Sequence, residues 1–211
     1  MHKYFIKTPW VVKKIFPNYI WTLPTDEKIV YLTFDDGPHP AITRWVLNQL
    51  EQYNAEASFF CIGNNVEKFP EVYKEILENN HVVGNHTHHH LNGWETEDEK
   101  YLNDIARASQ IIKSNLFRPP YGRIKNKQAK KVADAMQTRA SKIIMWDVLS
   151  ADFDSSISPE ECLNNVLENF SAGSIIVFHD SEKAFNNLKY ALPKTLEFLQ
   201  RGEFQCKRIE L

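Results

Sequence analysis

Side chains suited to acid, base or metal chemistry follow apolar runs at several points along the chain. Asp35 and Asp36, for example, come directly after the apolar run KIVYLTF at 28–34. Parallel strands of an α/β fold end at one rim, where such folds build their active sites, so these residues are predicted to meet there. The set comprises Asp35 and Asp36, His86 and His90, Arg118 and Tyr121, Asp147 and Asp152, and His179 and Asp180.

Two histidines of this set form part of a candidate metal site. His86 and His90 are four residues apart, so their rings face the same way if the segment is helical or tightly turned. Two imidazoles and a carboxylate leave positions open for water, which is how catalytic zinc and related divalent ions are bound. We therefore expect both histidines and one upstream aspartate to hold one divalent ion. His88 and His89 are expected to face solvent or to support the ligands.

The adjacent aspartates are expected to have different tasks. Neighbouring residues of an extended chain point to opposite sides, so Asp35 and Asp36 cannot easily share one role. One would bind the metal and the other would take a proton from metal-bound water. The alternative is an Asx turn or a helix cap ahead of Gly37 and Pro38, which is a common use of Asp-Gly-Pro.

Runs rich in β-branched and aromatic residues alternate with runs of helical periodicity. Strands are predicted at 28–34, 57–61 and 81–84, near Phe117, and at 142–146, 174–178 and 204–209. Helices are predicted at 42–53, 66–77, from a capping box at 96–99 to Leu116, and at 129–136, 158–173 and 188–199, the last with a kink or restart at Pro193. Seven strands alternating with six helices indicate an α/β domain with outer helices, either a barrel or a doubly wound sheet.

Four sequence motifs point to a known family. They are TFDDGP at 33–38, HTHHH at 86–90, RPPYG at 118–122 and SIIVFHD at 174–180. Over residues 28–211 the chain resembles the polysaccharide deacetylase family, also called the NodB-homology domain or carbohydrate esterase family 4. The resemblance implies a distorted (β/α)7 barrel, with which the predicted strand count agrees. It also implies one divalent ion, with zinc as the first choice and cobalt, nickel or iron as alternatives.

The resemblance assigns roles to the residues of the rim. It makes Asp36, His86 and His90 the metal ligands, Asp35 the general base and His179 the general acid. The supporting residues would be Arg118, paired with the base, Tyr121, whose N–H would face the oxyanion, and Asp152, which would orient the general acid, with Asp147 as a weaker candidate for that last role.

The same resemblance places several residues at the substrate. Phe153 stands where the family commonly has tryptophan, and Val177 stands where it usually has leucine, so substrate preference is the property most affected. Trp94 follows the histidine motif and is expected either to stack on a sugar ring or to pack within its loop. The predicted substrate-binding residues are Trp94, Pro120, Tyr121, Phe153 and Val177.

The expected reaction is hydrolysis of the acetamide of an N-acetylated sugar in a glycan. A divalent ion lowers the pKa of its bound water from about 16 toward about 7, and the general base removes the proton. The leaving amine needs the proton that the general acid provides. Two alternatives stay open: an O-acetyl ester or small amide or imide hydrolase on the same scaffold, and an inactive carbohydrate-binding relative.

The composition of the chain limits the classes of partner that the protein is expected to bind. Hydrophobic residues make up 43% of the 211 residues and charged residues 25%, with a formal net charge of −2. No basic field for nucleic acid is expected, and no apolar run reaches the roughly 18 residues of a transmembrane segment. The chain is predicted to be a monomer, and the family resemblance implies a glycan as its substrate.

Residues 1–27 are predicted to form an arm that packs on the domain at 28–211. The arm lacks the apolar core and small-residue cleavage site of a signal peptide, which favours the cytoplasm, whereas the family resemblance favours an extracytoplasmic location. Cys61, Cys162 and Cys206 are odd in number and form no CxxC motif, so buried free thiols are expected.

Overall fold

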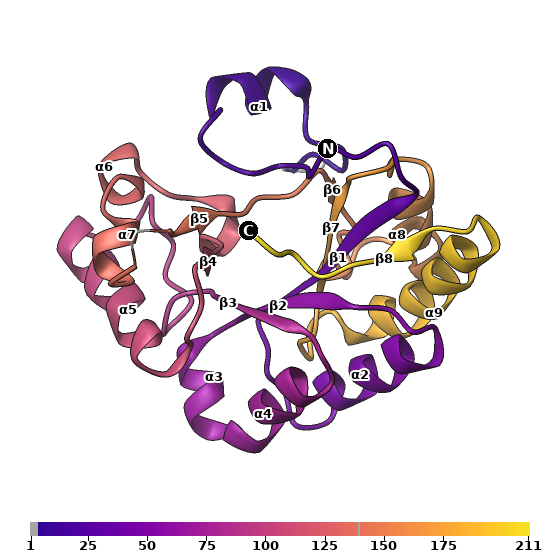
Figure 1. Ribbon diagram of the computed structural model, residues 1–211, viewed down its shortest axis with the longest axis horizontal. Helices are drawn as coiled ribbons and strands as arrows, with labels where there is room; N and C mark the ends of the chain where they lie inside the picture. The colour runs from indigo at the N-terminus through magenta and orange to yellow at the C-terminus, as the bar shows by residue number, and fades with distance from the viewer. Residues whose placement is uncertain (1–3, 139) are drawn as a thin grey trace.

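A curled sheet of parallel strands forms the centre of the fold. The computed structural model describes residues 4–138 and 140–211. The strands lie in the order β5-β4-β3-β2-β1-β7-β6, and β8 pairs with the start of β1. Helices surround the outside of the curl (Figure 1). The predicted single α/β domain with parallel strands and outer helices is confirmed, and the sheet has the form of a curled half-barrel.

The elements alternate along the chain as predicted for most of its length. The strands are β1 Ile29–Asp35, β2 Ala57–Cys61, β3 Val82–Asn85, β4 Leu116–Phe117, β5 Lys142–Ile143, β6 Val148–Leu149, β7 Ile175–His179 and β8 Gln205–Cys206. The helices are α1 Trp10–Ile15, α2 Ile42–Gln52, α3 Gly63–Lys68, α4 Pro70–Glu78, α5 Asp98–Ile111, α6 Asn126–Ala129, α7 Val132–Ala135, α8 Pro159–Leu167 and α9 Phe185–Arg201, with a 3-10 turn η1 at Pro120–Gly122.

Both faces of the sheet are packed with apolar side chains. On the face toward the helices, Phe34 of β1 stacks between Phe59 and Phe178, with ring centroids 5.0 and 6.1 Å apart. Alternate strand residues point to the other face, which is why the strands are apolar throughout. The inner cluster consists of Phe60, Leu116, Ile144, Ile175 and Ile209. Ile209 belongs to the C-terminal segment, which runs into the curl (Figure 1).

The N-terminal arm lies between the two ends of the sheet. Lys7 forms an antiparallel bridge with β6, and Ile20 forms a parallel bridge with Ile144, just after β5. The amines of Lys7 and Lys13 both contact the buried carboxylate of Asp147. Helix α1 lies over this part of the barrel (Figure 1). Asp147 thus anchors the arm, and it is not the partner of His179.

The predicted strand at 142–146 is wrong in its extent. The chain forms β5 and β6 instead, because Ile20 of the arm takes main-chain hydrogen bonds of the segment between them. Ile20 N–H donates to the Ile143 carbonyl at 2.9 Å, and Met145 N–H donates to the Ile20 carbonyl at 2.7 Å. Strand β6 does not pair beside β5: it pairs with β7, at the opposite edge of the sheet.

Several predicted helices also differ from the observed ones. The predicted helix at 66–77 is divided into α3 and α4, because Pro70 has no N–H and restricts Phe69 to non-helical backbone. The helix at 129–136 is likewise two short helices, α6 and α7. Glu97 rather than Thr96 caps α5, since its carboxylate accepts from two backbone N–H groups, and the helix ends at Ile111. Helix α9 runs through Pro193 without a restart.

The cysteines agree with the expectation from the sequence. Cys61, Cys162 and Cys206 are buried free thiols. Within residues 4–138 and 140–211, no helix combines the length and apolarity that crossing a bilayer requires.

Candidate active site

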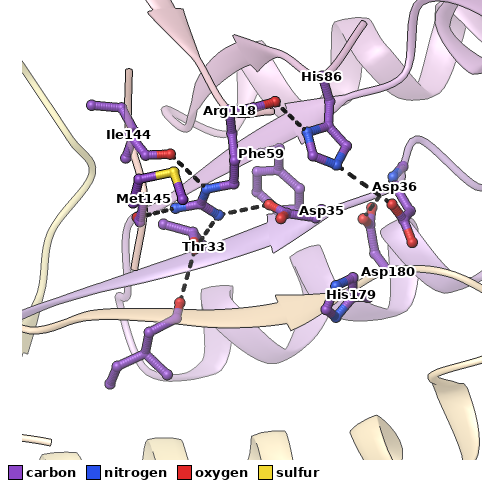
Figure 2. A network of polar contacts seen from close by, with 12 residues as sticks. Thr33, Asp35, Asp36, Phe59, His86, Arg118, Ile144, Met145, His179 and Asp180 are labelled. Atoms are coloured by element: carbon purple, nitrogen blue, oxygen red, sulfur yellow. Dashed lines mark hydrogen bonds and ion pairs between the residues drawn. The ribbon is translucent and has the colours of Figure 1, made fainter. Parts of the chain in front are cut away.

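The carboxyl ends of several strands bring acidic, imidazole and guanidinium groups together. Asp35 ends β1, His86 directly follows β3, Arg118 directly follows β4, and His179 ends β7. Figure 2 shows these side chains converging, with Asp35 turned toward Arg118 and Asp36 turned toward His86. The two adjacent aspartates therefore point to different partners, although Asp36 lies just beyond β1 and is not part of the extended strand.

Three side chains at this rim are arranged as a metal site. One ligand atom each from Asp36, His86 and His90 lies within 4.8 Å of the others. Asp36 Oδ1 is 3.1 Å from His90 Nε2 and 3.7 Å from His86 Nε2. This oxygen is buried and accepts no hydrogen bond from any described residue. A buried carboxylate oxygen without a donor, facing two imidazole nitrogens, fits a divalent cation.

The protonation state of His86 suits ligation. Its Nδ1 lies 2.7 Å from the Arg118 carbonyl, so Nδ1–H donates there and leaves the Nε2 lone pair toward Asp36. Burial lowers the pKa of His86 to about 4, which keeps the ring neutral. Burial alone would raise the pKa of Asp36, but the nearby imidazoles of His90, His179 and His86 lower it below its ordinary value. Neutral imidazole and ionised carboxylate are the forms that bind metal.

The histidine loop, residues 86–90, is held in a strained conformation by neighbouring side chains. Thr87 and His90 both have left-handed backbone, with φ of 61° and 55°. Asn85 Oδ1 accepts from Thr87 N–H at 2.8 Å, and Asp104 Oδ2 accepts from the main-chain N–H groups of the next two residues, at 2.8 Å each. Left-handed backbone in residues other than glycine persists only where the surroundings hold it. The loop therefore presents His90 at the cost of local strain.

Asp35 is held by a fully buried arginine. Arg118 Nη1 donates to Asp35 Oδ1 at 2.7 Å and to Thr33 Oγ1 at 2.8 Å. Its other nitrogens donate to the carbonyls of Ile144 and Met145, at 3.2 and 3.0 Å. These contacts fix the Asp35 carboxylate in one orientation beside the three-residue cluster (Figure 2). Because Arg118 has acceptors besides Asp35, its position does not depend on that aspartate alone.

His179 is paired with Asp152. His179 Nδ1 lies 2.7 Å from Asp152 Oδ1, and the His179 main-chain N–H donates to Asp152 Oδ2 at 2.7 Å. Burial lowers the pKa of His179, but the charge and hydrogen bond of Asp152, together with the charges of Asp36 and Asp35, outweigh it and raise the pKa to about 9. The ring therefore carries a proton at neutral pH, which suits a general acid.

Aromatic rings border the cluster on two sides. Phe153 packs edge-on against His179, with centroids 5.1 Å apart, and Tyr4 of the arm packs on Phe153 at 5.5 Å. On the other side, the Tyr121 ring lies 4.6 Å from His90, and 59% of Tyr121 is exposed. Tyr121 has φ of 60°, so the RPPYG turn is another left-handed point at this rim.

A comparison with known proteins identifies the family. A family model described as polysaccharide deacetylase matches residues 22–141, which is more than half of the chain. The chain belongs to the polysaccharide deacetylase family. A peptidoglycan-N-acetylglucosamine deacetylase of Bacillus cereus is 35% identical over 191 residues, covering 88% of each chain. The predicted family and the predicted enzyme class, a glycan deacetylase, are both confirmed.

Solved structures agree with this polysaccharide deacetylase assignment. A crystal structure of a peptidoglycan N-acetylglucosamine deacetylase in complex with 4-naphthalen-1-yl-N-oxidanyl-benzamide has a TM-score of 0.84 and 31% identity, covering 96% of this chain and 95% of the other. A mutant of a pseudoenzyme of carbohydrate esterase family 4, described as having restored enzymatic activity, has a TM-score of 0.79 and 25% identity, covering 92% and 70%. The fold therefore extends over nearly the whole chain.

Most of the site residues predicted for this polysaccharide deacetylase lie at one rim. Val177 points to the same sheet face as His179, two residues along β7, and Pro120 is buried in the RPPYG turn. Trp94 is 60% exposed, with its indole N–H bonded to the Ile124 carbonyl at 3.2 Å and Arg123 over its ring. Trp94 thus lies on the neighbouring loop, available to solvent but fixed in orientation.

His88 departs from one of the two environments expected for it, and two further residues of this polysaccharide deacetylase support the rim without a signal in the sequence. His88 does not face solvent: it is fully buried, and among described residues its ring has no hydrogen-bond partner, with Glu67 3.6 Å away. Asp104, on α5, had no catalytic motif to mark it, yet it holds the histidine loop. Asp180 was expected at the rim without a role, and its contacts with the Asp36–Gly37 turn emerge only from the structure.

Proposed function

We propose that this deacetylase removes acetyl groups from N-acetylglucosamine residues of a glycan with the help of one divalent ion. Asp36, His86 and His90 would hold the ion. Such an ion acts as a Lewis acid and lowers the pKa of bound water. The observation that carries the proposal is the buried, donor-free Asp36 oxygen facing two imidazole nitrogens. Zinc is the first choice, since two imidazoles and a carboxylate form a common catalytic zinc site.

The residues beside the ligands would move the protons. Asp35, oriented by Arg118, takes a proton from the attacking water. His179 gives a proton to the nitrogen of the leaving sugar amine, and Asp152 keeps that ring charged and oriented. The N–H of Tyr121 would stabilise the oxyanion, because a donor fixed in advance costs no reorganisation as charge develops.

The state of His179 supports amide hydrolysis over ester hydrolysis. An amine leaves poorly unless it is protonated, whereas an alkoxide depends less on a proton donor. A ring held in the charged form at neutral pH is therefore most useful for an acetamide. The name of the Bacillus cereus relative also refers to N-acetylglucosamine of peptidoglycan, which supports this sugar as the substrate.

The inactive alternative is not supported by the residues of the site. A protein that only binds carbohydrate has no need for a base, an acid and three converging ligand atoms. Asp35, Asp36, His86, His90 and His179 are all present and converge at one rim. We therefore expect the chain to turn over substrate without any restoring mutation.

Acetate release tests the proposal directly. We expect the zinc-loaded protein to release acetate from N-acetylglucosamine oligomers and from N-acetylated peptidoglycan, with loss of acetyl visible by mass spectrometry. A chelator should reduce the rate to background, and added zinc should restore it. Acetate from an O-acetylated glycan alone would move the assignment to the ester hydrolase. Absence of acetate from every substrate, with zinc bound, would identify an inactive relative.

The pH profile should report the Asp152–His179 pair. The general acid is active while protonated, so activity is lost as pH rises through the raised pKa of His179. Replacing Asp152 with Asn removes the largest influence that raises this pKa, so the alkaline limb of kcat should move to lower pH by about 1–3 units. Both proteins are compared at equal zinc loading. Glu182→Gln, which neutralises an exposed carboxylate nearby, should leave the limb in place; an unmoved limb in Asp152→Asn contradicts the pairing.

A further inference from the structure

Asp180 is a buried carboxylate that the proposed chemistry does not use. It follows the general acid His179 and is almost completely buried. Its Oδ1 accepts from Gly37 N–H at 3.0 Å, and its Oδ2 accepts from the Thr43 hydroxyl at the start of α2. Thr43 Oγ1 in turn accepts from His39 N–H at 2.7 Å. The carboxylate thus joins the end of β7 to the turn that contains Asp36.

Both peptide planes beside the Asp36 Cα atom are bonded to Asp180. The Asp35 carbonyl accepts from the Asp180 main-chain N–H at 3.1 Å. On the other side, Gly37 N–H donates to the Asp180 carboxylate, and the carbonyl of that same peptide plane accepts from Asn65 Nδ2 at 2.8 Å. The planes on either side of a Cα atom define its φ and ψ, so these contacts fix the backbone of Asp36.

That backbone conformation needs support. Asp36 has φ of 80°, in the left-handed region that non-glycine residues rarely adopt without outside constraint. Gly37 is required for the contact, because a Cβ atom there would lie 2.1 Å from a carboxylate oxygen of Asp180. Only glycine lets the carboxylate reach the turn. The position of the Asp36 side chain, and of its donor-free Oδ1, follows from this conformation.

We propose that Asp180 is a positioning residue for the metal site, which sets the direction of the Asp36 carboxylate by holding the Asp36–Gly37 turn. This inference rests on the proposed function, since it requires Asp36 to bind the ion. Asp180 itself would touch neither the ion nor the substrate. Residues that support metal ligands typically change metal affinity by about 10–100-fold when they are replaced.

Zinc affinity of the full chain tests the proposal without an activity assay. The apo protein is titrated with zinc in competition with a chromophoric chelator, and bound zinc is counted by elemental analysis. We expect Asp180→Ala to weaken zinc binding by about 10–100-fold, and Asp180→Asn, which keeps an acceptor for Gly37 N–H, to weaken it less. Thr43→Val, which removes one anchor of the carboxylate, should also weaken binding, whereas Thr43→Ser should bind as the wild type does.

A matched control separates positioning from general loss of packing. Thr195→Val has the same change of shape as Thr43→Val, at a buried hydroxyl without a partner among described residues, and it should leave zinc affinity unchanged. If Asp180→Ala fails to fold, the two Thr43 variants carry the test. Wild-type affinity in every folded Asp180 and Thr43 variant overturns the inference. A wild-type protein that binds no zinc overturns instead the proposed function.

Discussion

Replacing Asp35 with Asn is expected to abolish most turnover while leaving zinc bound. An amide of the same shape fills the same space but cannot take a proton from water, and loss of a general base typically costs about 10²–10⁴-fold in kcat. Arg118 keeps its bonds to Thr33, Ile144 and Met145, so the fold at this point should survive. The proposed metal ligands do not include Asp35, which is why affinity for zinc should be retained.

Turnover and zinc affinity measured on one preparation of Asp35→Asn test this prediction. Acetate release gives kcat, and the chelator competition gives zinc affinity for the same protein. Asp152→Asn provides a comparison at a second buried carboxylate of the rim: it should move the pH profile, whereas Asp35→Asn should lower the rate at every pH. Full activity in Asp35→Asn would show that the base assignment is wrong.

Much of the rim could be predicted because its residues obey a local rule. Polar side chains placed directly after apolar strands must meet where parallel strands end. The four motifs also indicated the family to which the chain belongs. Asp36 and His86 are brought together in this way, although 50 positions separate them. Asp35 and Asp36 do have different partners as expected, but Asp36 lies just beyond β1 with left-handed backbone, so strand alternation is not the reason.

Contacts between distant segments could not be predicted from the same patterns. The segment at 142–146 has the composition of one strand, but its hydrogen bonds depend on Ile20, more than 100 positions earlier. His88 has the same residue type as His89, yet it is buried and His89 is half exposed. Asp180 carries no spacing signal for its role, because its contacts with Gly37 and Thr43 form only where the carboxyl ends of β1 and β7 lie side by side.

The strained backbone at the rim also could not be predicted from sequence periodicity. Asp36, Thr87, His90 and Tyr121 all have left-handed backbone, and each belongs to a motif of the family. Non-glycine residues in this region are uncommon, and they gather where a side chain must be aimed against local preference. The motif residues therefore supply a particular backbone conformation as well as chemical groups. This is why residues that support that conformation, such as Asp104, matter.

Replacing His86 with Ala is expected to remove both zinc and turnover. The ring is fully buried, its Nδ1 is bonded to the Arg118 carbonyl, and its Nε2 is directed at Asp36 Oδ1. Alanine leaves two of the three proposed ligands, so zinc affinity should fall by more than the roughly 10–100-fold expected for a supporting residue. Acetate release should fall to the level of the chelated wild type.

His89→Ala is the matched control on the same loop. The His89 ring is half exposed, lies 2.5 Å from Asp104 Oδ1 and is not among the proposed ligands, so its loss disturbs the loop without removing a ligand. We expect His89→Ala to retain zinc at stoichiometric loading and to keep measurable turnover. Equal losses in His86→Ala and His89→Ala would mean that the loop conformation, rather than ligation by His86, explains the effect. Zinc retained by His86→Ala at wild-type affinity would place the ion elsewhere, because an aspartate and one imidazole are too few ligands for a catalytic zinc site.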